Sequence, residues 1–219
     1  MTDRLATELK QHGPVVVDTD CLSARDQLLV AASAIMRDGD TVDISLSELS
    51  LRSGLNSALV KYYFGNKQGL LQALLDRDMR NIIASLGALL AKDFEPDQKL
   101  RVHLNAVVRT YYQFPYLNRL LMRLVRESSP EAARKIADDY LRPISKAYDA
   151  LIKEGVEKGV FRPVDTQHFY FTVTGAADRF FSARLVLQHC YDTEDVSEQM
   201  CADYAAHTQE MIMRGILAP

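Results

Sequence analysis

Apolar residues recur every three or four positions along most of this 219-residue chain, the spacing that places them on one face of an α-helix. The first such face is formed by Leu28, Ala31, Ala32, Ile35 and Met36. No stretch shows a convincing strand pattern, and no segment repeats along the chain. The periodicity therefore predicts an all-α fold.

Glycines, prolines and capping residues divide this pattern into separate helices. The helices of the first third are expected to begin after four capping residues, Ser23, Ser45, Asn56 and Asn66. Further helices are predicted over 97–114, 116–127, 131–158, 166–189 and 196–215. Pro143 should kink the third of these later helices or end it early, because proline cannot donate the helical hydrogen bond.

Charge and composition exclude several classes of protein. The formal net charge of −3 argues against a chain that binds nucleic acid through bulk positive charge. Three cysteines without a CxxC pair argue against a disulfide framework and a structural zinc site, and they fit a reducing cytosol. No apolar run approaches the roughly 18 residues that a membrane helix needs. We therefore expect a cytoplasmic protein without a membrane partner.

The sequence predicts neither a metal site nor a cofactor. The five histidines are scattered, no two are spaced i,i+4, and His189-Cys190 lacks further ligands at metal spacing. Ser/His/Asp, Cys/His, paired-carboxylate and glycine-rich phosphate signatures do not stand out either. These features disfavour an enzyme.

Two short helices around Gly54 carry the clearest functional signal. Each is about seven residues long, so neither can bury enough surface alone. Glycine supplies the positive φ that a sharp helix stop needs, and Leu55 would fill the corner. The residues expected to pack against the first helix are Leu46, Leu49, Leu55, Val60 and Phe64. This arrangement is a helix-turn-helix, whose second helix enters the major groove of DNA.

The exposed side chains of the second helix suit contacts with DNA. Asn and Ser can hydrogen-bond base edges, Ala58 can touch a thymine methyl, and the basic and tyrosine side chains suit phosphates. The residues predicted to contact DNA are Ser45, Asn56, Ser57, Ala58, Lys61, Tyr62, Tyr63 and Lys67. Some have a plainer explanation: Ser45 and Asn56 also suit helix caps, and Tyr63 could lie in the core.

The motif is only weakly basic, which bears on how it could bind. Between positions 44 and 67 there are three basic residues, Arg52, Lys61 and Lys67, and one acidic residue, Glu48. Affinity would therefore depend on two copies of the motif rather than on one strong basic patch.

Residues 25–75 resemble the N-terminal domain of TetR-family transcriptional regulators. The resemblance rests on the helix from Arg25 to Met36, on ISLSEL from Ile44, on Gly54-Leu55-Asn56, and on ALVKYYFGNKQGLL from Ala58 to Leu71. The family often has Tyr at the position of Lys61, so the expected aromatic phosphate contact moves to Tyr62. The rest of the chain is similar to the family only in its helical layout.

The resemblance implies an all-α protein of three parts. Residues 23–68 would form a three-helix helix-turn-helix DNA-binding domain and 69–219 a helical ligand-binding and dimerisation domain. Residues 1–22 show no clear period and are expected to form the third part, a flexible N-terminal arm. The resemblance also implies a repressor that leaves a palindromic operator when a small ligand binds. The alternative is a helical protein-interaction module that does not bind DNA.

The last two predicted helices suggest how two copies would pair. Residues 166–189 are apolar on almost every side, which indicates burial on several sides. With residues 196–215 they are predicted to form a four-helix bundle across a two-fold axis, giving a homodimer. Asp178 and Arg179 lie inside this apolar segment. They are expected to pair with charges on other helices or across the dimer, or else to face a ligand cavity.

Pockets between bundle helices are common binding sites for small molecules, mostly apolar with a few polar groups. The residues predicted to contact an unknown effector are Asn105, Tyr111, Tyr112, Met122, Tyr148 and Asp178. For each aromatic residue among them, plain core packing is the competing explanation.

Overall fold

The computed structural model describes residues 22–219. The first half of that range contains α2 (Ala24–Asp38), α3 (Leu46–Ser53), α4 (Ala58–Phe64), α5 (Lys67–Leu90) and α6 (Pro96–Gln113). The second half contains α7 (Leu117–Glu127), α8 (Pro130–Ile136), the π-helical turn η2 (Ala137–Leu141), α9 (Arg142–Glu157), α10 (Thr166–Ser182), α11 (Arg184–Tyr191) and α12 (Glu198–Ile216). Within this range extended backbone pairs only at an isolated bridge between Phe161 and Leu217, which confirms the all-α prediction. The arm expected over residues 1–22 lies, except for Leu22, outside the described residues.

Local sequence signals account for the ends of the early helices. The side chains of Ser23, Ser45 and Asn66 each accept a hydrogen bond from the backbone N–H three residues later, at 2.9–3.1 Å. Asn56 accepts one from the backbone N–H two residues later, at 2.8 Å. Gly54 has φ 69°, the left-handed conformation that ends α3 and directs the chain into α4.

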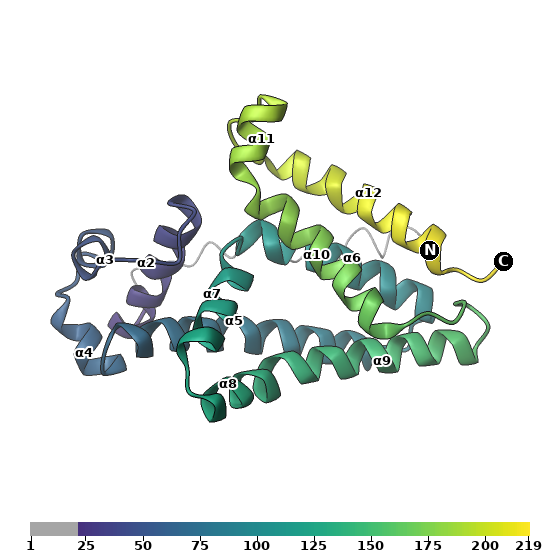
Figure 1. The fold of residues 1–219 in the computed structure, drawn as a ribbon, viewed down its shortest axis with the longest axis horizontal. Helices are drawn as coiled ribbons and strands as arrows, with labels where there is room; N and C mark the ends of the chain where they lie inside the picture. The colour runs from purple at the N-terminus through teal and green to yellow at the C-terminus, as the bar shows by residue number, and fades with distance from the viewer. Residues whose placement is uncertain (1–21) are drawn as a thin grey trace.

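Two of the later helices differ from the prediction. The expected helix 131–158 loosens into the π-helical turn just before Pro143, which sits in the first turn of α9. The expected helix 166–189 is not continuous, because Ala183 leaves the helical conformation at φ −99° and ψ 37°. Helix α11 then leaves the body of the chain (Figure 1), and within the described chain none of its residues is buried. Apolar periodicity carries no information on such a backbone break.

The helix-turn-helix packs as a small three-helix unit. Leu49 and Val60 are buried against α2, and Leu55 and Phe64 pack at the edge of the same core. Leu46 was expected there as well, but it is 39% exposed. It is the first residue of α3, and α3 turns the side carrying Leu49, not Leu46, toward the core.

The core of the helix-turn-helix continues into the rest of the molecule. The same buried cluster includes Tyr116, Leu120 and Leu124, from the start and inner face of α7. Helix α5 runs through the domain boundary expected at residue 68 and continues alongside the C-terminal helices (Figure 1). The helix-turn-helix therefore rests on both α5 and α7.

The remaining helices surround α6. Helices α10 and α12 pack against α6, and α9 packs against α5, α6 and α10. Together α10, α11 and α12 form the side of the molecule away from α5 (Figure 1). None of the helices within residues 22–219 combines the length and the hydropathy needed to cross a membrane.

Candidate nucleic-acid interface and effector region

Helix α4 is anchored on one side and open on the other. Val60 is buried, whereas Lys61 is exposed and Tyr62 is 78% exposed. Tyr63 is 38% exposed and packs edge-to-face against Tyr62, with 4.8 Å between ring centroids. The outer face of α4 therefore presents a cation and two phenol groups, which suit phosphates and base edges.

The start of α4 presents small polar and apolar groups. Asn56 and Ala58 are exposed, and Ser57 is half-buried. The hydrogen bond from the Ala58 N–H uses only the side-chain oxygen of Asn56, so its amide NH₂ remains a donor for a base edge.

Two of the three cations in the motif are already paired with acids. Lys67 Nζ lies 2.7 Å from Asp43 Oδ1, and Arg52 pairs with Asp38. Both acids precede residue 44, so a count of charges over 44–67 misses them. The Ser45 hydroxyl oxygen accepts the capping hydrogen bond from the Glu48 N–H and lies 3.2 Å from the hydroxyl of Ser47. The motif is thus closer to neutral in space than along the sequence.

Two arginines of α7, which no motif in the sequence singles out, hold the loop between α2 and α3. Arg119 donates to the backbone carbonyl of Asp40 at 2.8 Å and pairs with its carboxylate. Arg123 donates to the carbonyl of Val42 at 2.8 Å and lies 3.5 Å from Asp43 Oδ1. Their spacing of four residues on one helix face is visible in the sequence. Their partners about 80 residues earlier are not.

Three of the six predicted effector contacts gather between α6, α9 and α10. Burial raises the pKa of Tyr111, and the negative charge of the Asp178 carboxylate raises it further. Tyr148 is buried nearby, and burial together with the neighbouring Tyr170 and Tyr111 raises its pKa as well. Tyr148 and Tyr170 pack edge-to-face with 5.5 Å between ring centroids. This aromatic group with one carboxylate is the candidate effector region.

His103, one of the scattered histidines without metal-ligand spacing, belongs to this region. It is buried, and burial lowers its pKa to about 4, so the imidazole is neutral at pH 7. Its ring lies edge-to-face with Tyr148, with 4.9 Å between centroids. His103 Nε2 and the Tyr148 hydroxyl are buried and have no hydrogen-bond partner within residues 22–219. Such groups can accept or donate to a bound molecule.

The other three predicted effector contacts have different neighbours. Asn105 is half-buried and accepts a hydrogen bond from Arg109 at 3.2 Å. Tyr112 packs against Phe181, with 5.8 Å between ring centroids. Met122 packs against the cluster that includes the helix-turn-helix core. Tyr111 packs against the same cluster as Tyr112, the one that contains Phe181, whereas Met122 packs against a different cluster.

Within residues 22–219 neither Asp178 nor Arg179 forms an ion pair with another helix, and pairing across the dimer stays a prediction. Asp178 accepts a hydrogen bond from the amide of Asn118 at 2.8 Å, and its other oxygen is buried with no hydrogen-bond partner in the described chain. Arg179 is exposed and lines a surface hollow beside α11. One helical turn therefore directs Asp178 inward to α7 and Arg179 outward.

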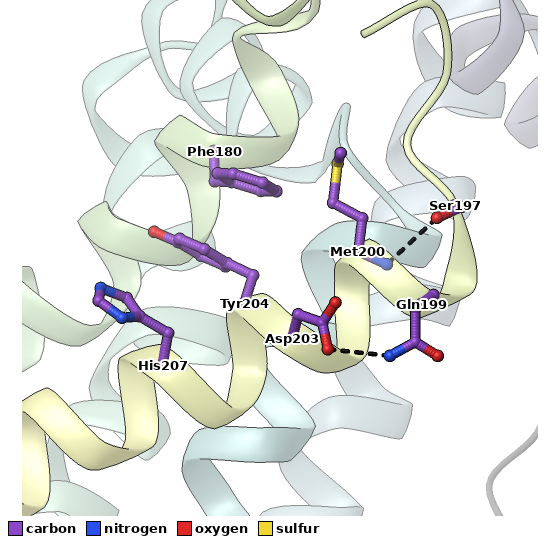
Figure 2. A pocket seen from close by; sticks show the side chains of 7 residues that line it. All are labelled: Phe180, Ser197, Gln199, Met200, Asp203, Tyr204 and His207. Carbon is purple, nitrogen blue, oxygen red and sulfur yellow. Dashed lines mark hydrogen bonds between the residues drawn. The ribbon is translucent and has the colours of Figure 1, made fainter. Parts of the chain in front are cut away.

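The outer side of α10, α11 and α12 is hollowed and apolar. Figure 2 shows Phe180 stacked on Tyr204, with 3.8 Å between ring centroids and 10° between planes. These two residues and Met200 line both a hollow of about 480 Å³ and a neighbouring one of about 620 Å³. Large exposed apolar residues on the same three helices are Phe171, Leu185, Val186, Tyr191 and Met211. An apolar surface of this extent is typical of an interface.

Known proteins with similar sequences are transcriptional regulators. HTH-type transcriptional regulator RutR of Escherichia coli K12 is 23% identical over 135 residues, which are 62% of this chain and 63% of that protein. HTH-type transcriptional regulator BetI 1 of Chromohalobacter salexigens is 26% identical over 100 residues, which are 45% of this chain and 48% of that protein. The chain thus matches about half to just under two thirds of the length of these relatives.

The fold is also similar to that of solved structures. A transcriptional regulator of the TetR/AcrR family from Thermobifida fusca matches with a TM-score of 0.65 at 21% identity, over 87% of this chain and 97% of that one. The family model for the tetracyclin repressor-like C-terminal domain matches residues 93–219, more than half of the chain. With its N-terminal helix-turn-helix and helical C-terminal region, this chain belongs to the TetR family.

Proposed function

We propose that this protein is a dimeric, sequence-selective DNA-binding regulator of transcription, a repressor released by a small ligand bound in its C-terminal region. The observation that carries the proposal is the outer face of α4. Its polar N-terminus, Lys61 and Tyr62 are exposed while Val60 holds the helix in the core. We propose no catalytic activity, no metal and no cofactor.

In this proposal α4 enters the major groove N-terminus first. Asn56, Ser57 and Ala58 would contact base edges, and Lys61 with Tyr62 would contact phosphates on one side of the groove. Ser45, Tyr63 and Lys67 would contact phosphates at the edges of the interface. The helix-turn-helix units of the two subunits, roughly 34 Å apart, would read the two halves of a palindromic operator.

The second copy would pair through residues 166–189 and 196–215, now resolved into α10, α11 and α12. The exposed apolar residues of these helices and the hollows beside Phe180 and Tyr204 support this choice. Helix α11 has no buried residue within the described chain, so a second copy would give it the packing that its own chain lacks. Burial of this apolar surface would drive association.

The effector would bind between α6, α9 and α10, next to Tyr111, Tyr148 and Asp178. The unpartnered polar atoms of His103 and Tyr148 support a ligand that combines apolar surface with hydrogen-bonding groups. Asn105, Tyr112 and Met122 remain less direct candidates for the same role. The helix-turn-helix units of the dimer would exchange between two spacings, of which one fits the operator. A ligand that binds the other spacing more tightly would shift this equilibrium and so release the operator.

The direct test is selection of DNA by the protein itself. Wild-type protein incubated with a pool of random-sequence duplexes should enrich a two-fold symmetric sequence. Lys61→Ala should weaken binding to the enriched duplex about fivefold and reduce the salt slope by about one. Asn56→Ala should relax the preference at one base pair of each half-site. Lys146→Ala, an exposed lysine on α9, is the matched control and should bind like the wild type.

Failure to enrich any sequence, with salt-insensitive binding, would remove the regulator proposal. Equal loss of affinity in the Lys61 and Lys146 variants would also count against it, because it would indicate a general charge effect. The alternative, a helical protein-interaction module, would be favoured by a wild-type protein that binds no duplex and by a cellular phenotype unchanged in the Asn56 and Lys61 variants.

The dimer surface is tested by Leu185→Glu, on α11. Leu185 is 66% exposed, so the change should leave the folded single chain intact but place two glutamates in the proposed interface. We expect the dimer dissociation constant, measured by sedimentation, to rise about 30-fold. Leu51→Glu on α3, where the leucine is 88% exposed, makes the same exchange outside α10–α12 and should leave the dimer unchanged. Equal effects of the two variants would place the interface elsewhere.

A further inference from the structure

One carboxylate oxygen at the edge of the helix-turn-helix faces two cations. Asp43 lies in the loop between α2 and α3, and its Oδ1 is 2.7 Å from Lys67 Nζ and 3.5 Å from Arg123 Nη1. Lys67 begins α5, directly after α4, whereas Arg123 belongs to α7. A single acid therefore joins a cation beside the DNA-facing helix to a cation of the C-terminal region.

Arg123 is held firmly where it meets this acid. Its Nη1 donates to the carbonyl of Val42 at 2.8 Å and its Nε to Glu127 at 2.9 Å. One turn earlier, Arg119 donates to the carbonyl of Asp40. Two arginines of α7 thus fix the loop that carries Asp43, and any displacement of α7 relative to α2 must change these contacts.

Asp43 is an anion that competes with DNA for Lys67. The hydrogen bond and charge of Lys67, together with the charge of Arg123, hold the pKa of Asp43 below its ordinary value. A carboxylate bound to the Lys67 ammonium takes one of its three donors and opposes its attraction to a phosphate. Arg123 pulls on the same oxygen, so its presence weakens the hold of Asp43 on Lys67.

Resting on the proposed DNA binding, we propose that Asp43 restrains Lys67 from the DNA phosphate and that Arg123 relieves this restraint by sharing the carboxylate. Asp43 is then a positioning residue rather than a DNA contact. The contact between α7 and the loop sets how freely Lys67 reaches DNA. Separation of Arg123 from Asp43 leaves the carboxylate to Lys67 alone and lowers the affinity for the operator.

The first measurement is the affinity for the duplex enriched by the wild-type protein. Asp43→Asn should bind about fivefold more tightly, because Lys67 is released. Arg123→Gln should bind about threefold more weakly, because Asp43 is no longer shared. The double variant should bind close to Asp43→Asn, since without the Asp43 carboxylate the loss of Arg123 no longer changes the hold on Lys67. Weaker or unchanged binding by Asp43→Asn, or additive effects in the double variant, overturns the proposal.

Two variants separate this effect from a general change of charge. Glu48→Gln removes an exposed acid from the same motif, and Arg126→Gln removes an exposed cation from α7. Neither side chain forms a hydrogen bond or ion pair within residues 22–219. Each should change the affinity by less than about twofold. A change as large as that of Asp43→Asn or Arg123→Gln would attribute the result to long-range charge and contradict the shared-carboxylate mechanism.

A second measurement needs no DNA. The rate at which an N-hydroxysuccinimide ester acylates Lys67, followed by mass spectrometry relative to Lys61, reports how strongly the amine is held. Asp43→Asn should raise this relative rate about threefold and Arg123→Gln should lower it. Unchanged rates in both variants overturn the inference whatever the DNA result. Absence of duplex binding by the wild type, with the expected rates, instead removes the proposed function and with it the role assigned to Lys67 on DNA.

Discussion

Gly69→Ala should lower the affinity for the enriched duplex about 100-fold while leaving the C-terminal helices folded. Gly69 lies in the first turn of α5, and a methyl group there would stand 2.0 Å from the backbone carbonyl oxygen of Phe64. Phe64 is the last residue of α4. Because neither partner is a flexible side chain, the turn between α4 and α5 must move by more than an ångström.

The displacement would fall on the proposed DNA contacts. Helix α4 is only seven residues long, so a shift at its end moves its whole outer face. Each base or phosphate contact contributes roughly 1–3 kcal/mol when well aligned, and losing one or two accounts for the expected drop. The readouts are titration of the labelled duplex and circular dichroism, which should show nearly unchanged helix content.

Gly87→Ala is the matched control for this prediction. Gly87 lies in the same helix α5, and a methyl group there meets nothing within 4 Å. Alanine is the better helix former, so this variant should be more stable by up to about 1 kcal/mol and should bind DNA normally. Normal DNA binding by the Gly69 variant would show that the position of α4 does not control recognition.

The features that could be predicted from the sequence are those set within a few residues of each other. The caps at Ser23, Ser45 and Asn66 and the left-handed Gly54 follow from side-chain chemistry and backbone sterics alone. The same local signals predict the order of the early helices, and that order with its motifs led to the resemblance to the TetR family. The predicted DNA and effector contacts rest on the same local reasoning, and they remain predictions.

Features that depend on distant residues could not be predicted in this way. The partners of Arg119 and Arg123 lie about 80 residues away, and nothing local distinguishes these arginines from solvated ones. His103 looks unremarkable in the sequence, and only packing buries it beside Tyr148. The break at Ala183 is likewise a matter of backbone geometry at a residue that favours helices.

A buried polar network joins the two parts of the molecule, and its removal should be costly. Asp78 in α5 is 3% exposed, accepts a hydrogen bond from the Tyr116 hydroxyl at 2.8 Å, and pairs with Arg77. The Tyr116 hydroxyl also lies 2.7 Å from the hydroxyl of Ser33 in α2. This network ties the helix-turn-helix to α5 and to the start of α7.

Asp78→Ala should lower the free energy of unfolding at pH 7 by about 3 kcal/mol, measured by urea denaturation. It leaves the Tyr116 hydroxyl and the half-buried Arg77 with one partner fewer and opens a small cavity. Asp149→Ala, which removes an exposed carboxylate from the middle of α9, should change stability by less than about 0.5 kcal/mol. A loss below about 1 kcal/mol for Asp78→Ala would mean that desolvation of the carboxylate offsets its bonds.

The pH dependence of the same network provides an independent check. Burial raises the pKa of Asp78 above its ordinary value of 3.8, despite the opposing effects of Arg77 and Tyr116. As the pH rises from about 4, the unfolded chain loses this proton first, so the folded state binds more protons and stability falls until the folded pKa is passed. Asp78→Asn has no titrating group at this position, so its stability should not show this decrease. The stability difference, wild type minus Asp78→Asn, should therefore decrease as the pH rises above about 4. A difference that instead increases with pH would show that Arg77 and Tyr116 outweigh burial and hold the pKa of Asp78 below 3.8.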